Sequence, residues 1–219
     1  GLRLDNEALR VAVGLRLGAE ICQPYRCTCG APVDSRGSHA LSCRSNPGRS
    51  QRHHWLNDLV WRAMAKAGFP SIKEPQNLLR TDGKRPDGLS LIPWQDGRCV
   101  TWDVTVTDTV AASYLNNTAS CAGSAAEAAA SRKEDKYAEI AVRYHFFPLA
   151  FETFGPINQA GCEFLSSLGH RLSLVSDDPR ETSFLFQRLS VSIQRFNSVC
   201  FCNSFGNLPA QFFYQPGHT

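Results

Sequence analysis

The densest run of β-forming residues in this 219-residue chain is 99–107, and it constrains the fold more than any other segment. The run is rich in Val, Thr and Trp, which favour strands. A Gln-Asp-Gly turn signal at 95–97 precedes it, so residues 85–94 are predicted to be its hairpin partner. Residues 71–79 predict a further strand, and Pro75 within them places that strand at a sheet edge.

Helical patterns surround these strands. The steps of three and four residues between apolar positions predict four helices. One further strand is predicted between the second and the third of them. The predicted helices are 52–68, 125–143, 157–168 and 182–199, and the predicted strand is 145–151. The predicted order is helix, three strands, helix, strand and helices. This order describes one α/β domain with a mixed sheet, in which a helix connects the third strand to the fourth.

The overall composition indicates a globular chain outside the membrane. Apolar residues make up 42% and charged residues 20% of the sequence, which is ordinary for a soluble domain. No stretch reaches the roughly 18 apolar residues of a membrane span, so we expect no membrane contact. The net charge of +3 permits nucleic acid as a partner and does not identify it.

Residues 22–51 need a disulfide bond or a bound metal ion to hold a fold. They are rich in Cys, Gly, Ser, Arg and Pro and cannot bury a core. The nine cysteines are an odd number, and no secretion signal precedes them, which disfavours a disulfide framework. Tetrahedral zinc takes four S or N ligands, and the sequence offers Cys27, Cys29, His39 and Cys43. The single residue between the first two cysteines is a short gap, so Cys22 is an alternative ligand.

A zinc ion held by four protein ligands would fold its segment and would have no open coordination position for catalysis. Together, these patterns predict four segments. The predicted segments are the tail of a preceding domain or a linker helix at 1–21, the zinc knuckle at 22–51, the α/β domain at 52–203 and a flexible tail at 204–219.

Two aspartates are expected to lie together in the sheet. Asp87 is nine residues before Asp96 in the turn and Asp103 is seven after it, which makes them near neighbours across the hairpin. A carboxylate inside the run 100–106 is costly to bury unless it is paired or binds metal. The alternatives are an exposed face of an edge strand and a structural hydrogen bond.

The helix 125–143 adds a cation. Lys133 is the one charge in a stripe of alanines, Tyr137 and Ile140 that is expected to face the sheet. A lysine that reaches two aspartates could act on a phosphate or on water. The alternatives are that Lys133 extends past the alanines into solvent, or that Lys136, beside the stripe, is the active lysine.

Taken together, these motifs resemble a known nuclease family. The resemblance is to the restriction-like PD-(D/E)XK endonuclease domain. The motifs that carry it are Arg85-Pro86-Asp87, the run 102–108 and the segment 133–137. They are more narrowly similar to the endonuclease that follows the reverse transcriptase in certain site-specific non-LTR retrotransposons. The resemblance covers residues 22–155 and includes the Cys and His knuckle and the Arg52-His53 pair.

The resemblance implies roles for individual residues. Asp87 and Asp103 match the two acids that bind Mg²⁺ or Mn²⁺, and Lys133 matches a lysine that this branch supplies from the helix, since Thr105 stands at the usual lysine position. Glu74 matches another acidic position; a charge at a strand end is the alternative. We also expect nucleic-acid contacts by Arg52, His53 and Arg85, and from its place at a helix start His53 could instead approach the active site. The alternatives are a polar helix start for His53 and a surface charge for Arg85.

The expected function is that of a Mg²⁺-dependent endonuclease that cuts target DNA in the nucleus for retroelement insertion. Its expected partners are DNA, a reverse transcriptase domain in the full-length chain, and RNA through that parent protein. Two alternatives stay open: a catalytically inactive nucleic-acid-binding module of the same fold, and a DNA-repair or junction nuclease.

Overall fold

A computed structural model describes residues 2–76, 78, 85–111 and 113–205. Within it the chain forms two compact units, Gly1–Arg52 with Val191–Thr219, and His53–Ser190. The sequence predicted one domain over 52–203, whereas residues from 191 onward belong with the front of the chain. The predicted tail at 204–219 lies, from residue 206 onward, outside the described residues.

The larger unit is built on a four-stranded sheet. Its strands are β3 (Ser71–Lys73), β4 (Gly88–Ser90), β5 (Val100–Thr107) and β6 (His145–Glu152), in the order β3-β4-β5-β6. The pairs β3–β4 and β4–β5 are antiparallel, and β5–β6 is parallel. The prediction of a mixed sheet with a crossover is confirmed.

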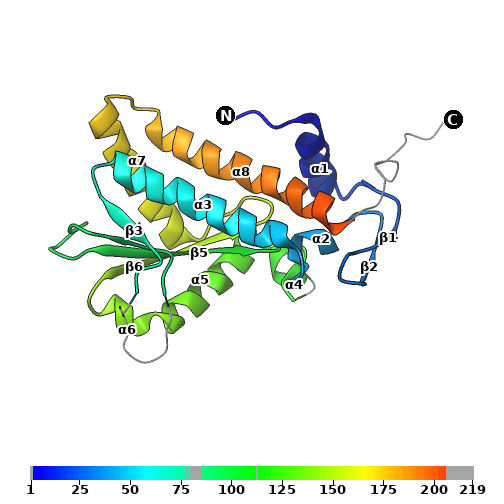
Figure 1. The fold of residues 1–219 in the computed structure, drawn as a ribbon, viewed down its shortest axis with the longest axis horizontal. Coiled ribbons are helices and arrows are strands. Elements are labelled where there is room, and N and C mark those ends of the chain that lie inside the picture. The colour runs from blue at the N-terminus through cyan, green and yellow to red at the C-terminus, as the bar shows by residue number, and fades with distance from the viewer. Residues whose placement is uncertain (1, 77, 79–84, 112, 206–219) are drawn as a thin grey trace. The chain divides into compact units, whose positions relative to one another are not determined.

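Helices cover both faces of this sheet (Figure 1). The helices with residues in the larger unit are α3 (Pro47–Lys66), α4 (Leu115–Thr118), α5 (Ser124–Lys136), α6 (Ala138–Ala141), α7 (Gln159–Ser176) and α8 (Glu181–Ser204). Trp102 of β5 donates to Asn57 of α3 (2.8 Å), and Phe147 of β6 stacks on Phe164 of α7. Because side chains alternate along a strand, Asp103 lies on the opposite face, where α5 packs.

The contact between α5 and the sheet depends on small residues. Ala126, Ala129 and Ala130 are buried against Ala150 of β6. Methyl groups on both surfaces let the helix backbone approach the sheet closely. A side chain that follows the alanines on the same helix face therefore reaches the strands.

Several elements differ in extent from the sequence prediction. The strand predicted at 71–79 ends at Lys73, since Glu74 has φ of 47° and Pro75 follows it. The helix predicted at 125–143 is interrupted at Tyr137, and α4 lies between β5 and α5, where no helix or strand was predicted. The helices predicted at 157–168 and 182–199 are longer as α7 and α8.

The smaller unit contains α1 (Asn6–Leu17), β1 (Tyr25–Arg26), β2 (Pro32–Val33) and α2 (His39–Ser42), with the first residues of α3 and the end of α8. Buried polar contacts connect its segments. Asn46 donates to the carbonyl oxygen of Cys200 (2.6 Å), and the hydroxyls of Tyr25 and Ser204 are hydrogen-bonded (2.5 Å). No helix among the described residues is long and apolar enough to cross a membrane.

The start of α5 is capped by a residue of the sheet. Gly123, at the N-cap, has φ of 91° and no side chain to accept hydrogen bonds. Glu152, at the end of β6, is 0% exposed, and its Oε1 accepts from the N–H groups of Ala125 (3.0 Å) and Ala126 (3.3 Å). A carboxylate is favourable at a helix N-terminus, so Glu152 helps to set where α5 lies on the sheet.

We expect Glu152→Ala to lower the free energy of unfolding by about 2–3 kcal/mol, because it leaves a cavity and two uncapped N–H groups. Urea denaturation measures this loss. The matched control is Glu139→Ala, which removes an exposed carboxylate from α6. Equal stability of the two variants would contradict the capping role.

Candidate functional site

The register of the sheet brings the two aspartates together. Gly88 pairs with Trp102, so the next positions along the antiparallel ladder are Asp87 and Asp103. The N–H of Asp87 donates to the carbonyl oxygen of Trp102 (2.9 Å), and Asp87 Oδ2 accepts from the N–H of Val104 (2.6 Å). The carboxylate of Asp87 is therefore held against β5 beside Asp103.

Asp103 is a buried carboxylate with a partner at each oxygen. The residue is 4% exposed, which excludes the exposed edge face considered above. Its Oδ2 lies 2.5 Å from Lys133 Nζ, and its Oδ1 accepts from the Tyr137 hydroxyl (2.7 Å). Burial and the charge of Asp87 raise the pKa of Asp103, and Lys133 and Tyr137 offset only part of that rise.

The two lysines of α5 occupy different environments. Lys133 and Tyr137 are four residues apart and share one side of the helical turn, which brings both to Asp103. Lys136 instead contacts Tyr137: its Nζ lies 2.9 Å from the tyrosine hydroxyl and 4.5 Å from the ring centroid. The geometry therefore favours Lys133 over Lys136 as the lysine that acts at the carboxylates.

His53 completes the cluster from α3. Its Nε2 lies 3.0 Å from Asp87 Oδ2. Burial alone lowers the pKa of His53, but its hydrogen bond with Asp87 and the charges of Asp87 and Asp103 raise that pKa above its usual value. Of the two positions that the sequence allowed for His53, near the active site or near a phosphate, the structure has its ring nitrogen against the carboxylate of Asp87.

The remaining predicted site residues lie in three different settings. Arg85 is exposed beside the cluster, and its carbonyl oxygen lies 2.7 Å from the Tyr137 hydroxyl oxygen. Glu74 is exposed, and its N–H donates to the carbonyl oxygen of Asp87 (3.1 Å). Arg52 is 1% exposed, and its guanidinium donates to Asn197 Oδ1 (2.6 Å) and to the carbonyl oxygen of Leu41 (3.2 Å). A buried arginine with these bonds has a structural role in place of the predicted phosphate contact.

The smaller unit holds the predicted Cys and His cluster. The ligand atoms of Cys27, Cys29, His39 and Cys43 all lie within 4.8 Å of one another, so the four residues could bind a metal such as zinc. Cys27 Sγ is 3.7 Å from Cys43 Sγ, close to the roughly 3.8 Å expected between two sulfurs that each lie about 2.3 Å from a tetrahedral zinc. Cys22 lies outside this cluster, and its thiol donates to carbonyl oxygens of Asp34 and Ser35 (both 3.5 Å).

Local geometry prepares one of these sulfurs for metal binding. A backbone hydrogen bond at Ala31 and a contact between Cys29 Sγ and His39 Nε2 (3.3 Å) lower the pKa of Cys29 to about 6. A thiolate is the form that binds zinc. Burial, by contrast, raises the pKa of Cys43 to about 11.

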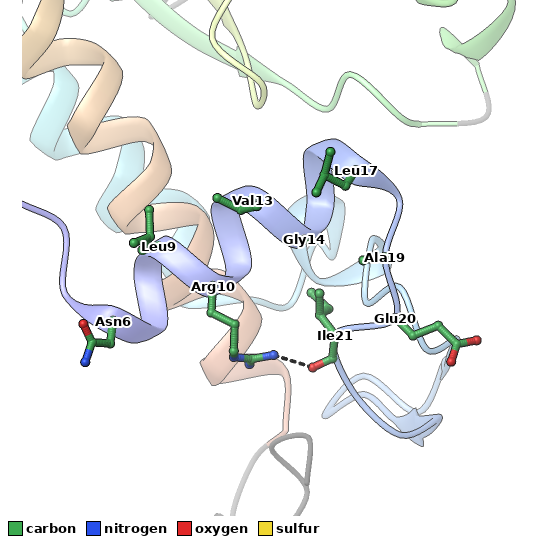
Figure 2. Close-up of a pocket in the computed structure, with 9 residues that line it drawn as sticks. All are labelled: Asn6, Leu9, Arg10, Val13, Gly14, Leu17, Ala19, Glu20 and Ile21. Carbon is green, nitrogen blue, oxygen red and sulfur yellow. Dashed lines mark hydrogen bonds between the residues drawn. The ribbon is translucent and has the colours of Figure 1, made fainter. Parts of the chain in front are cut away.

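The smaller unit also has an open groove (Figure 2), which is separate from the predicted sites. Its volume is about 560 Å³, and exposed apolar side chains of α1 form one wall. Arg10 crosses it and donates to the carbonyl oxygen of Ile21 (2.7 Å). The lining residues are Asn6, Leu9, Arg10, Val13, Gly14, Leu17, Ala19, Glu20 and Ile21, none of which is a predicted site residue.

Sequence reasoning missed two contacts of the cluster. The sequence placed Tyr137 in the helix stripe and did not assign its hydroxyl a partner, and it did not pair His53 with Asp87. The spacing of four residues between Lys133 and Tyr137 was a usable signal. No local pattern connects His53 to Asp87, which lies 34 residues away.

Comparison with known proteins adds no identification. No protein-family model matches this sequence, and none of the curated proteins compared with it matches either.

We expect the purified protein to carry one zinc ion per chain and Cys43→Ser to lose it, because a zinc-binding Cys and His cluster needs all four ligands. Zinc released to a chromogenic chelator measures the content. Cys121→Ser, which changes an exposed cysteine outside the cluster, is the matched control. Retention of zinc by Cys43→Ser at the level of that control would contradict the assignment.

We also expect Asp103→Asn to stabilise the zinc-loaded, magnesium-free protein at neutral pH. Folding raises the pKa of Asp103, so as pH rises the Asp103 carboxyl loses its proton in the unfolded chain before it does in the folded chain. The free energy of unfolding therefore falls as pH rises through the unfolded and then the folded pKa of Asp103. Asparagine does not titrate, so the variant should lack this pH-dependent loss of stability. Urea denaturation at several pH values measures the difference, which should shrink at acidic pH. Asp135→Asn, at an exposed position of α5, should show no such pH-dependent gain.

Proposed function

We propose that residues 53–190 form a PD-(D/E)XK-type endonuclease domain that hydrolyses phosphodiester bonds in DNA with Mg²⁺ or Mn²⁺. The observation that carries the proposal is that a lysine and a second aspartate both lie next to Asp103. Lys133 lies at one of its oxygens, and Asp87 is next to it across the ladder. Two acids and a lysine on adjacent strands and a packed helix are the groups this chemistry requires.

The donor set suits a hard divalent cation. Carboxylate oxygens are the ligands that Mg²⁺ prefers. The two carboxylates lie close enough that the charge of Asp87 raises the pKa of Asp103. A divalent cation would relieve this repulsion, so the residues fit the proposed ion.

Each residue of the cluster has a role that follows from its contacts. The bound ion would supply Lewis acidity and activate water. Asp87 and Asp103 would hold it, and His53 and the N–H of Val104 keep Asp87 in place. The Lys133 side chain is 25% exposed, so its ammonium can also approach a phosphate and stabilise negative charge there. Arg85 is exposed beside the cluster and could contact the DNA backbone.

The smaller unit would support DNA binding. We propose that Zn²⁺ at the Cys and His cluster folds this segment and positions its arginines near phosphates. The resemblance to non-LTR retrotransposon endonucleases supports a role in target-DNA cleavage in the nucleus. The partners would be a reverse transcriptase domain of the same full-length chain and RNA through that parent protein.

Plasmid nicking in Mg²⁺ or Mn²⁺ tests the proposal. We expect wild-type protein to nick DNA, and Asp103→Ala and Lys133→Ala each to lose about 100-fold or more of the rate, because each removes a group that stabilises the transition state. Arg132→Ala is the matched control, since Arg132 is an exposed cation of α5 whose guanidinium contacts Tyr114.

The controls separate the active site from folding and from contaminating nucleases. All variants must unfold cooperatively and retain zinc. Cleavage by Asp103→Ala at the wild-type rate would contradict the proposal. Binding of DNA by folded, zinc-loaded wild type without cleavage in either metal would favour an inactive nucleic-acid-binding module.

A further inference from the structure

The Tyr137 hydroxyl lies among three polar atoms. It is 2.7 Å from Asp103 Oδ1, 2.7 Å from the carbonyl oxygen of Arg85 and 2.9 Å from Lys136 Nζ. The residue is 0% exposed, so these neighbours determine what the hydroxyl does.

The hydroxyl hydrogen belongs with Asp103. A phenol has one hydrogen to donate, and two acceptors lie equally near. Hydrogen bonds to a carboxylate are stronger than those to a neutral carbonyl. Whichever acceptor takes the hydrogen, the phenol oxygen faces the other one with lone pairs only, and this repulsion is larger against a charged carboxylate than against a neutral carbonyl. Lys136 donates to the phenol oxygen, which leaves the phenol hydrogen for the carboxylate.

This bond leaves Asp103 with one oxygen for a cation. Oδ1 accepts from Tyr137, which is fully buried, whereas Oδ2 faces Lys133, whose side chain is 25% exposed and can turn toward a phosphate, which leaves Oδ2 to the cation. A carboxylate with one available oxygen suits Mg²⁺, which takes few protein oxygens at short distance. Ca²⁺ is larger, takes more oxygens and often uses both oxygens of one carboxylate.

We infer that Tyr137 determines the metal preference of the site, because its hydrogen bond to Oδ1 opposes binding of a cation by both oxygens of Asp103 and so favours Mg²⁺ over Ca²⁺. The inference rests on the proposed function, since it concerns the same two carboxylates. Tyr137 is a specificity-determining residue that acts through Asp103.

Tyr137→Phe isolates the hydroxyl. The tyrosine ring packs against Phe146 with centroids 4.9 Å apart, and phenylalanine keeps that contact. The variant releases Asp103 Oδ1 and leaves Lys133 and Asp87 unchanged. Tyr114→Phe is the matched control, because it removes a hydroxyl that contacts α5 through Arg132 and not through a carboxylate.

Isothermal titration calorimetry of the zinc-loaded full chain with MgCl₂ and with CaCl₂ tests the inference without any cleavage reaction. We expect the ratio of Ca²⁺ affinity to Mg²⁺ affinity to rise about tenfold in Tyr137→Phe and to stay at the wild-type value in Tyr114→Phe. Lys133→Met removes a competing charge from Oδ2, so it should strengthen binding of both ions and leave their ratio unchanged.

The outcomes are distinct. An unchanged ratio in Tyr137→Phe, with metal bound by wild type, overturns the inference and leaves the endonuclease proposal intact. A ratio that rises equally in Lys133→Met overturns it as well, because charge would then explain the preference. Wild type that binds Ca²⁺ more tightly than Mg²⁺ overturns it without any variant. If wild type binds neither ion, or if Asp103→Asn binds both as wild type does, the proposed function fails together with the inference.

Discussion

The burial of one carboxylate, Asp103, determines much of the larger unit. A charged oxygen at 4% exposure is costly unless partners surround it. The partners come from α5, where Lys133 and Tyr137 each contact one oxygen. The helix must therefore lie along the sheet at one position, since a shift of a turn would leave the carboxylate and the ammonium separated. The groups that satisfy Asp103 are also those from which the proposed chemistry follows.

The position of α5 is determined from both ends. At its start, Glu152 accepts from the first N–H groups of the helix. Along its length, alanines allow close approach to Ala150 of β6. At its end, Tyr137 connects Asp103 to the backbone of Arg85. A helix held in this way fixes the backbone position of Lys133, which is what a preorganised site requires.

The smaller unit solves a different physical problem. Its segments β1, β2 and α2 are too short to bury a core of their own, and a metal bound by the Cys and His cluster would join the turn after β1 to α2. The end of α8 adds buried contacts, among them the hydrogen bond from Asn46 to Cys200. Arg52 belongs to this structural set, although its sequence position beside His53 suggested a contact with DNA.

The sequence by itself determined the mixed α/β order and the pairing of Asp87 with Asp103, and it singled out the four residues of the Cys and His cluster with Cys22 as an alternative. Each of these depends on local spacing: strand alternation, a hairpin turn, or ligands within a short segment. Tertiary structure decided the rest. Lys133, and not Lys136, contacts Asp103, and His53 contacts Asp87. Arg52 is buried, and residues 191–204 belong to the smaller unit. These outcomes depend on which distant segments pack together, and residue spacing along one chain carries no information about that.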